Sequence, residues 1–241
     1  MENRWKEIWD NKGLNFAPLF DGKDTFSVYK ELKKMDGFDV SVEDAEGYYR
    51  SFFESEKNMW VQLQEELGTF SAYEVGCGCG ANLYLLQKLN INECGGMDYS
   101  RNLINIARKV VNDFHDISVD EAINIDVTHC YDIVFSDSVF PYFKNVEYGM
   151  NVLEKMYLKA RKLVIVQEVL DESKKRECMR KRYELYDNYS DRYAGLDKTF
   201  YSKELFNQFA ESHHCKIRFS DVNNKYYWNS EYMFNCFLEK K

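Results

Sequence analysis

Short apolar runs alternate with amphipathic stretches along the chain from residue 68 onward. SAYEV, CGGMD, YDIVFS and KLVIVQEV have the length and apolar content of strands, and ISVDEA predicts a further short strand. Between these runs, ANLYLLQKL and the residues after Ser100 place apolar side chains at helical spacing, as do residues 146–161 and 202–212. This alternation predicts βα units on a mostly parallel sheet, closed by the strands KIRFSDV and EYMFNCFLEK.

The first 67 residues follow a different pattern and carry no strand signal. Their large apolar residues fall on helical faces, as seen for Trp5, Ile8, Trp9, Phe52, Phe53, Trp60, Leu63 and Leu67. No repeat or proline-rich linker separates this part from the rest. We therefore predict a helical cap at residues 1–67 and one α/β domain at residues 68–241.

Charge and cysteine content narrow the classes of function. The 32 basic and 40 acidic residues give a net charge of −8, which is opposite to that of most proteins that bind nucleic acid. No apolar run approaches the roughly 18 residues needed to span a membrane. An odd number of cysteines, seven, and no signal-peptide pattern indicate a reducing compartment. We expect a cytoplasmic protein that binds neither nucleic acid nor membrane.

The stretch YEVGCGCGANLY places a glycine loop between the first predicted strand and the first helix of the sheet. The two cysteines lack the spacing of a zinc site, so no metal is predicted. We interpret them as small apolar residues that pack within a tight turn. Gly76, Gly78 and Ala81 match the dinucleotide fingerprint, which leaves a nicotinamide enzyme as an alternative. Glu74, however, would face the negative pyrophosphate, whereas its carboxylate suits a cationic ligand.

S-adenosylmethionine is a cationic nucleoside that fits these residues better. The glycines let the backbone approach its amino acid part, and Glu74 offsets its positive charge. Asp98 ends the second strand 22 positions after Gly76, close to the spacing at which a carboxylate reaches ribose hydroxyls. Asp98 could instead cap the helix that follows. The segment Asp120-Glu121-Ala122 would lie beside the adenine, or form an ordinary surface loop.

EVGCGCG, GGMDYSRNLINIARK, YDIVFSDSVFPYF and the closing strands resemble class I S-adenosylmethionine-dependent methyltransferases over residues 68–241. The resemblance implies a Rossmann-like α/β three-layer sandwich with a seven-stranded, mostly parallel sheet of order 3-2-1-4-5-7-6 and an antiparallel last strand. It also implies a cofactor-binding set in which Asp98 serves the ribose, Ser136 forms the wall beside the methyl group, and Tyr99 is a further member. The set is completed by Glu74, Gly76, Gly78 and Gly80 at the methionine part, and by Glu121 and Ala122 at the adenine.

A second likeness covers nearly the whole chain. WKEIWDNKG, MDGFD, VDEAINI, FSDSVFPYF and GLDKTFYSKELF are similar to bacterial methyltransferases of capsule and surface-polysaccharide gene clusters. Some of that group act on sugar hydroxyls or phosphoramidate decorations, which implies a small-molecule or activated-glycan acceptor. The group carries histidine where this chain has Asp137 and Lys198.

Methyl transfer is an in-line displacement that needs alignment and exclusion of water, and a hydroxyl acceptor also needs a base. Asp137 follows the fourth strand and Tyr142 lies one turn on, so both are catalytic candidates, together with Tyr201. Glu168 could face the same cleft or cap a helix. Aromatic residues could close over the cofactor, namely Trp5, Trp9, Tyr49, Trp60, Phe140, Tyr142 and Tyr201. We predict O-methylation; the alternatives are N-methylation of a small metabolite and a non-catalytic, cofactor-binding regulatory protein.

Overall fold

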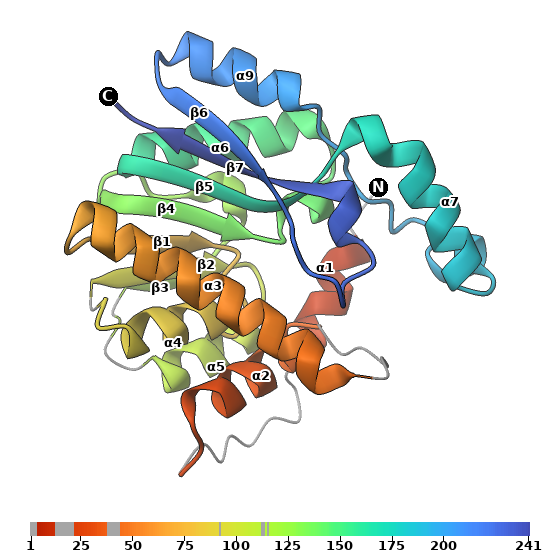
Figure 1. The fold of residues 1–241 in the computed structure, drawn as a ribbon, viewed down its shortest axis with the longest axis horizontal. Coiled ribbons are helices and arrows are strands. Elements are labelled where there is room, and N and C mark those ends of the chain that lie inside the picture. Colours follow the sequence, from red (N-terminus) through yellow and green to blue (C-terminus); the bar gives the residue numbers. More distant parts are fainter. Residues whose placement is uncertain (1–3, 13–21, 38–43, 92, 112–113, 115) are drawn as a thin grey trace.

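The computed structural model describes residues 4–12, 22–37, 44–91, 93–111, 114 and 116–241. Its seven strands form one sheet of order β3-β2-β1-β4-β5-β7-β6, which confirms the order expected from the resemblance (Figure 1). The first five strands pair in parallel, and β7 is antiparallel to both of its neighbours. The strands are β1 Ala72–Val75, β2 Cys94–Asp98, β3 Asp116–Val119, β4 Tyr131–Asp137, β5 Ala160–Leu170, β6 Lys216–Asp221 and β7 Met233–Glu239.

Helices connect these strands and precede them. Polar side chains accept hydrogen bonds from first-turn backbone N–H groups at several helix starts, including Asp44, Ser100 and Ser202. The helices are α1 Arg4–Asp10, α2 Thr25–Met35, α3 Ala45–Leu67, α4 Ala81–Lys88, α5 Arg101–Val110, α6 Val146–Lys159, α7 Lys175–Leu185, α8 Tyr189–Arg192 and α9 Lys203–Ser212. Short 3-10 turns are η1 Ala122–Asn124, η2 Phe140–Tyr142, η3 Glu172–Lys174 and η4 Ser230–Tyr232.

Alternating side chains on β4 build the two halves of the core. Ile133 and Phe135 pack with residues of α2, α3, α4 and α5, whereas Val134 packs on the other face with residues of α6 and α9. Figure 1 shows these two groups of helices on opposite sides of the sheet. The result is the expected three-layer sandwich, with strands that are apolar on both faces.

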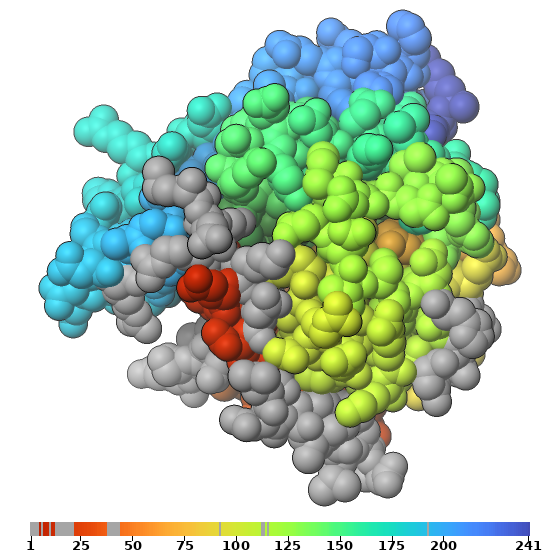
Figure 2. Space-filling model, turned by 180° about the vertical axis from the view of Figure 1, so that it is seen from behind, coloured from red at the N-terminus to blue at the C-terminus, as the bar shows by residue number. Residues whose placement is uncertain are grey.

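The helices before β1 share the core of the sheet. Trp60 on α3 is fully buried, and its ring meets Phe135 of β4 edge-on at 4.8 Å between centroids. Tyr29 and Leu32 of α2 belong to the same cluster. Helix α1 lies at the surface, in red in Figure 2. Regular structure in the described part of residues 1–67 is helical, as expected, while the division at residue 67 stays a prediction.

Two element boundaries differ from the prediction. The helix expected at residues 146–161 ends at Lys159, because Ala160 already pairs with Tyr131 in the ladder between β5 and β4. The third strand ends at Val119, so residues 120 and 121 lie in the loop that leads to η1. Within the described ranges, no helix is both long and apolar enough to cross a bilayer.

Candidate functional site

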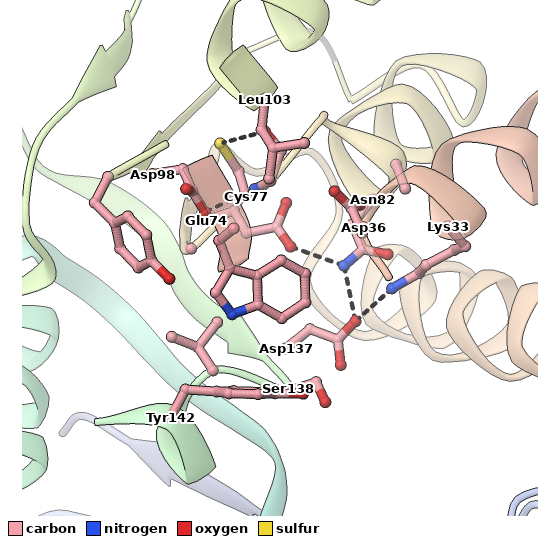
Figure 3. A pocket seen from close by; sticks show the side chains of 16 residues that line it. Lys33, Asp36, Glu74, Cys77, Asn82, Asp98, Leu103, Asp137, Ser138 and Tyr142 are labelled. Atoms are coloured by element: carbon pink, nitrogen blue, oxygen red, sulfur yellow. Dashed lines mark hydrogen bonds and ion pairs between the residues drawn. The ribbon is translucent and has the colours of Figure 1, made fainter. Parts of the chain in front are cut away.

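Two adjoining cavities lie at the carboxyl ends of β1, β2 and β4, where open α/β sheets bind ligands. The first, of about 90 Å³, is lined by the glycine loop, by Asp137 and by residues of α1 and α2 (Figure 3). The second, of about 530 Å³, extends over η1. Both cavities are lined by Gly76, Asp98, Tyr99, Val139 and Tyr142.

The glycine loop has a backbone that side chains would not tolerate. Gly76, Gly78 and Gly80 have φ values of 80°, 52° and 86°, in the left-handed region. A Cβ on Gly76 would collide with the Val139 side chain, and one on Gly78 with the Asp36 carboxylate. The loop therefore keeps its backbone open to the first cavity. Cys77 and Cys79 are buried free thiols that fill the turn, as predicted, and burial raises the pKa of both.

Glu74 lies in the first cavity with one carboxylate oxygen unused. Its Oε1 accepts a hydrogen bond of 2.8 Å from Asn82 Nδ2 in the first turn of α4. Its Oε2 is buried and meets no hydrogen-bond donor in the part of the chain that the structure describes. Burial raises the pKa of Glu74 well above its usual range, because a lone buried carboxylate is costly. A cationic ligand beside the glycine loop would supply the missing partner.

Asp98 joins the glycine loop to the residues that precede α5. Its Oδ1 accepts from Ser100 N at 2.8 Å and its Oδ2 from Gly78 N at 3.1 Å, so the carboxylate ties the glycine loop to the start of α5. The helix cap itself is Ser100, whose Oγ accepts from Leu103 N. Asp98 nevertheless lines both cavities together with Tyr99, at the position expected for ribose binding.

The second cavity is lined by residues of η1 and of the segment that follows β4. Glu121 and Ala122 lie on its wall, as predicted, and are joined by Ile123, Val139 and Phe143. The backbone N–H of Ile123 donates to Tyr148 Oη, which fixes η1 against α6. The role of Glu121 and Ala122 beside an adenine stays a prediction.

Asp137 is held by partners that the sequence did not reveal. Lys33 Nζ of α2 lies 2.7 Å from Asp137 Oδ2, and the two side chains are only 6% and 7% exposed. Asn82 Nδ2 also donates to Asp137 Oδ2, at 3.1 Å, so it bridges Asp137 and Glu74 (Figure 3). Asp36, the C-cap of α2, accepts from Cys79 N at 2.8 Å. Helix α2 and its C-cap thus contribute two charged groups to the site.

Aromatic rings cover the cavities from the side of α1. Tyr142 meets Trp5 and Trp9 edge-on, at 4.9 and 5.4 Å between ring centroids. Lys198 Nζ lies 3.3 Å from the centroid of Tyr142, a cation–π contact. Trp9 lines the first cavity, Trp5 the second and Tyr142 both, in agreement with part of the predicted aromatic closure.

Two predicted site residues lie elsewhere. Tyr201 is fully buried in the core around α6 and α9, and its hydroxyl donates to Phe140 O at 3.1 Å, so it lines neither cavity. Ser136 is fully buried as well and lines neither cavity, so its role as a wall of the methyl site stays a prediction. The other aromatic candidates, Tyr49, Trp60 and Phe140, are core residues.

Comparison with known proteins agrees with this geometry. Residues 73–161 match the family model of the methyltransferase domain. No curated protein sequence matches the chain significantly. Among solved structures, magnesium protoporphyrin IX methyltransferase of Synechocystis, with SAH bound, superposes with a TM-score of 0.66 at 11% identity, covering 92% of this chain and 96% of that one.

Two further structures share the fold. The N-methyltransferase NodS of Bradyrhizobium japonicum, in complex with S-adenosyl-L-homocysteine, has a TM-score of 0.57 at 12% identity and covers 90% of this chain and 99% of its own. The plantazolicin methyltransferase BpumL, with SAH and a desmethyl plantazolicin analogue, gives 0.60 at 12% identity and 99% of both chains. The domain match supports a methyltransferase, and these neighbours, at 11–12% identity, show that the chain shares their fold.

Proposed function

We propose that this chain, whose residues 73–161 match the methyltransferase domain, transfers the methyl group of S-adenosylmethionine to a small molecule. The observation that carries the proposal is the buried, unused oxygen of Glu74 beside three left-handed glycines. That pair of features fits the cationic methionine end of the cofactor. Asp98 and Tyr99 are proposed to hold the ribose, and Glu121 and Ala122 to border the adenine.

The residues of the chain would bind and align the reactants. The cofactor, when bound, supplies a methyl group already activated by a positive sulfur. Glu74 balances that charge and the glycine loop positions the methionine part, while Trp9 and Tyr142 exclude water from the first cavity. Asp137 lies at the same edge, where its carboxylate can orient the acceptor while Lys33 holds it in place.

The acceptor class has two candidates. The sequence resemblance to capsule and surface-polysaccharide methyltransferases supports a hydroxyl or phosphoramidate group on an activated glycan precursor. N-methylation of a small metabolite is the second candidate, because Glu74 and Asp137 place carboxylates on the wall of the first cavity. A cytoplasmic location and the absence of nucleic acid among the partners stay predictions from the sequence.

Calorimetric titration with S-adenosylmethionine and S-adenosylhomocysteine tests the first half of the proposal. Glu74→Gln should weaken binding of the methyl donor by about ten-fold or more, through loss of a charge-assisted contact. Glu65→Gln is the matched control, since it makes the same change on an exposed position of α3. Absence of binding by either ligand at millimolar concentration would refute the function, and binding without turnover of any acceptor would favour the regulatory alternative.

A further inference from the structure

A cavity between α3 and the strands β5, β6 and β7 shares no lining residue with the two cofactor cavities. We call it the α3 cavity. Its volume is about 340 Å³, within the range of roughly 300–1,000 Å³ that small-molecule sites occupy. Its walls come from α3, from Gln167 and Glu168 of β5, from residues 218–224, and from Asn235 and Phe237 of β7. The sequence left open whether Glu168 faces the cofactor cleft or caps a helix, and the structure places it here.

Buried side chains of the α3 cavity carry polar atoms that the rest of the protein does not satisfy. Glu56, Gln167, Glu168 and Asn224 are each between 4% and 6% exposed. Among the described residues, no hydrogen-bond partner reaches one oxygen of each of the first three side chains, or the amide nitrogen of the fourth. Proteins satisfy the large majority of such buried atoms. These four atoms on the walls of one cavity are therefore available to a ligand.

Hydrogen bonds hold two of these side chains in place. Gln167 Nε2 donates to Glu56 Oε1 at 2.5 Å, which links β5 to α3. Asn224 Oδ1 accepts from Tyr226 N at 3.1 Å, and this leaves the amide nitrogen for another partner. The available atoms thus belong to side chains whose orientation is already fixed, so a ligand would not have to order them on binding.

Strand β5 is irregular beside the α3 cavity. Glu168 has φ of 56°, in the left-handed region, and its N–H donates to Asn235 Oδ1 at 3.0 Å. The pairing of β5 with β7 shifts register between Val166 and Val169, the two residues that flank this segment. Such irregularities re-aim side chains and are over-represented next to functional sites. Regular pairing is thus interrupted at a residue that lines the cavity.

The charges of the α3 cavity favour a neutral ligand. In the part of the chain that the structure describes, the carboxyl groups of Glu56, Glu66, Glu168 and Asp221 face one guanidinium group, that of Arg218, so an anion would meet a surplus of acids. Burial raises the pKa of Glu168 to about 8 and that of Glu56 to about 7, so both largely keep their protons at neutral pH and attract a cation weakly. The described ranges hold no cluster of His, Cys, Asp and Glu suited to a metal ion.

Amide side chains dominate the polar wall of the α3 cavity. They belong to Asn58, Gln62, Gln167, Asn223, Asn224 and Asn235. Each amide carries donors and an acceptor, and so does a protonated carboxyl group. A matching ligand must donate and accept hydrogen bonds at several points, as a ring of hydroxyl groups does. Phe52, Met59 and Leu63 of α3 add the apolar surface that small-molecule sites also contain.

We propose that the α3 cavity binds a neutral polyhydroxylated ligand, such as a hexose ring, through its four buried side chains with unpartnered atoms. The site is distinct from the cofactor cavities, and its ligand binding does not depend on methyl transfer. Gln167 pairs with Asp137 in the ladder of β4 and β5, and its carbonyl oxygen accepts from Ser138 N at 3.3 Å. Since Asp137 and Ser138 line the first cofactor cavity, the two sites lie at adjacent strand ends of one sheet edge.

Saturation-transfer NMR on the full chain tests the proposal. It is run with and without S-adenosylhomocysteine, so that sugar binding and cofactor binding are measured separately. The probes are glucose, galactose and mannose, each compared with its amino sugar and its uronic acid, which change the charge of the ring. We expect a neutral sugar to bind about ten-fold or more tightly than its charged counterparts, because a charge would lose its hydration in the cavity. Binding by no neutral sugar, or tighter binding by a charged one, overturns the proposal.

A filling variant locates the ligand. Ser55 lies on an exposed position of α3 and lines the α3 cavity, so Ser55→Trp should fill the cavity and abolish sugar binding. Glu65→Trp is the matched control, because it places the same side chain on an exposed position of α3 outside the cavity. Sugar binding that survives Ser55→Trp, or that is lost equally in both variants, refutes the assignment to this cavity.

A double variant separates recognition from folding. Glu56→Met with Gln167→Met removes a hydrogen-bonded pair together with two unpartnered oxygens, while the side-chain volumes stay similar. Replacing both partners of a buried pair by apolar groups is nearly neutral or stabilising. The Tm should therefore be unchanged or higher, while sugar affinity falls about ten-fold or more. A lower Tm with unchanged sugar affinity would show that the pair serves the fold alone, and would overturn the proposal.

Discussion

Lys33 and Asp137 form a buried ion pair whose disruption has a predictable size. The variant Lys33→Met keeps most of the side-chain volume but removes the charge 2.7 Å from Asp137 Oδ2. Breaking such a pair costs about 3–5 kcal/mol, because the remaining charge stays buried. Asp137 keeps its hydrogen bond from Asn82, so we expect the lower end, about 3 kcal/mol. For a chain of this length, that corresponds to a Tm lower by roughly 6–12 °C.

The pH dependence of this loss follows from the neighbouring acids. Burial alone would lower the pKa of Lys33, but the charge of Asp137 raises it well above its usual range, so the pair stabilises the wild type up to high pH. Burial raises the pKa of Glu56 to about 7. Burial also raises the pKa of Glu74 well above its usual range, and the charge of Lys33 counteracts both shifts. Without Lys33 these acids bind protons more tightly in the folded state, so the variant loses more stability at pH 8 than at pH 5.

Urea unfolding at both pH values measures the effect in a double-mutant cycle. Lys33→Met with Asp137→Asn removes both charges and should recover most of the stability lost in the single variant. Lys34→Met is the control on the same helix, since its pair with Glu31 is about 40% exposed and should contribute less than about 1 kcal/mol. A cost below 1 kcal/mol for Lys33→Met at pH 8, or no recovery in the double variant, would refute the reasoning.

Three further substitutions test the site. Tyr201→Phe should lower the free energy of unfolding in urea by about 1 kcal/mol, through loss of the hydrogen bond to Phe140 O, and leave cofactor affinity unchanged. A fall in turnover without a loss of stability would instead indicate a catalytic role for Tyr201. Asp98→Ala should weaken cofactor binding about ten-fold or more by calorimetry, and unchanged affinity would remove its ribose role. Gly76→Ala should reduce the free energy of unfolding and the cofactor affinity. Adding Val139→Ala removes the methyl group that the new Cβ would meet, so both quantities should partly recover. If neither recovers, the whole effect comes from the left-handed backbone at Gly76.

Much of the fold is readable from local pattern. The runs that form β4 and β5 are apolar on both faces, and the glycine loop with Asp98 at the next strand end identifies the cofactor edge. The boundary between α6 and β5 could not be read from the sequence in this way. Lys159 ends the helix and Ala160 begins the strand because Ala160 pairs with Tyr131 of β4. That pairing depends on a partner strand and leaves no local signal.

The acceptor side was harder to predict than the cofactor side. Lys33 reaches Asp137 across 104 positions of sequence, and a lysine on an amphipathic helix reads as solvated until the fold brings a carboxylate to it. Tyr201 was predicted at the site because its neighbours in sequence are polar, whereas its side chain is fully buried in the core.

The position of β7 has a consequence for synthesis of the chain. It follows β6 in sequence but lies between β5 and β6, and hydrogen-bonds to both. Until residues 233–239 have left the ribosome, β6 has no strand to pair with and β5 exposes an open edge. Premature termination before this segment would therefore divide the sheet internally and not trim its margin. The nascent protein therefore gains both β6 and β7 in its sheet only once residues 233–239 have been made.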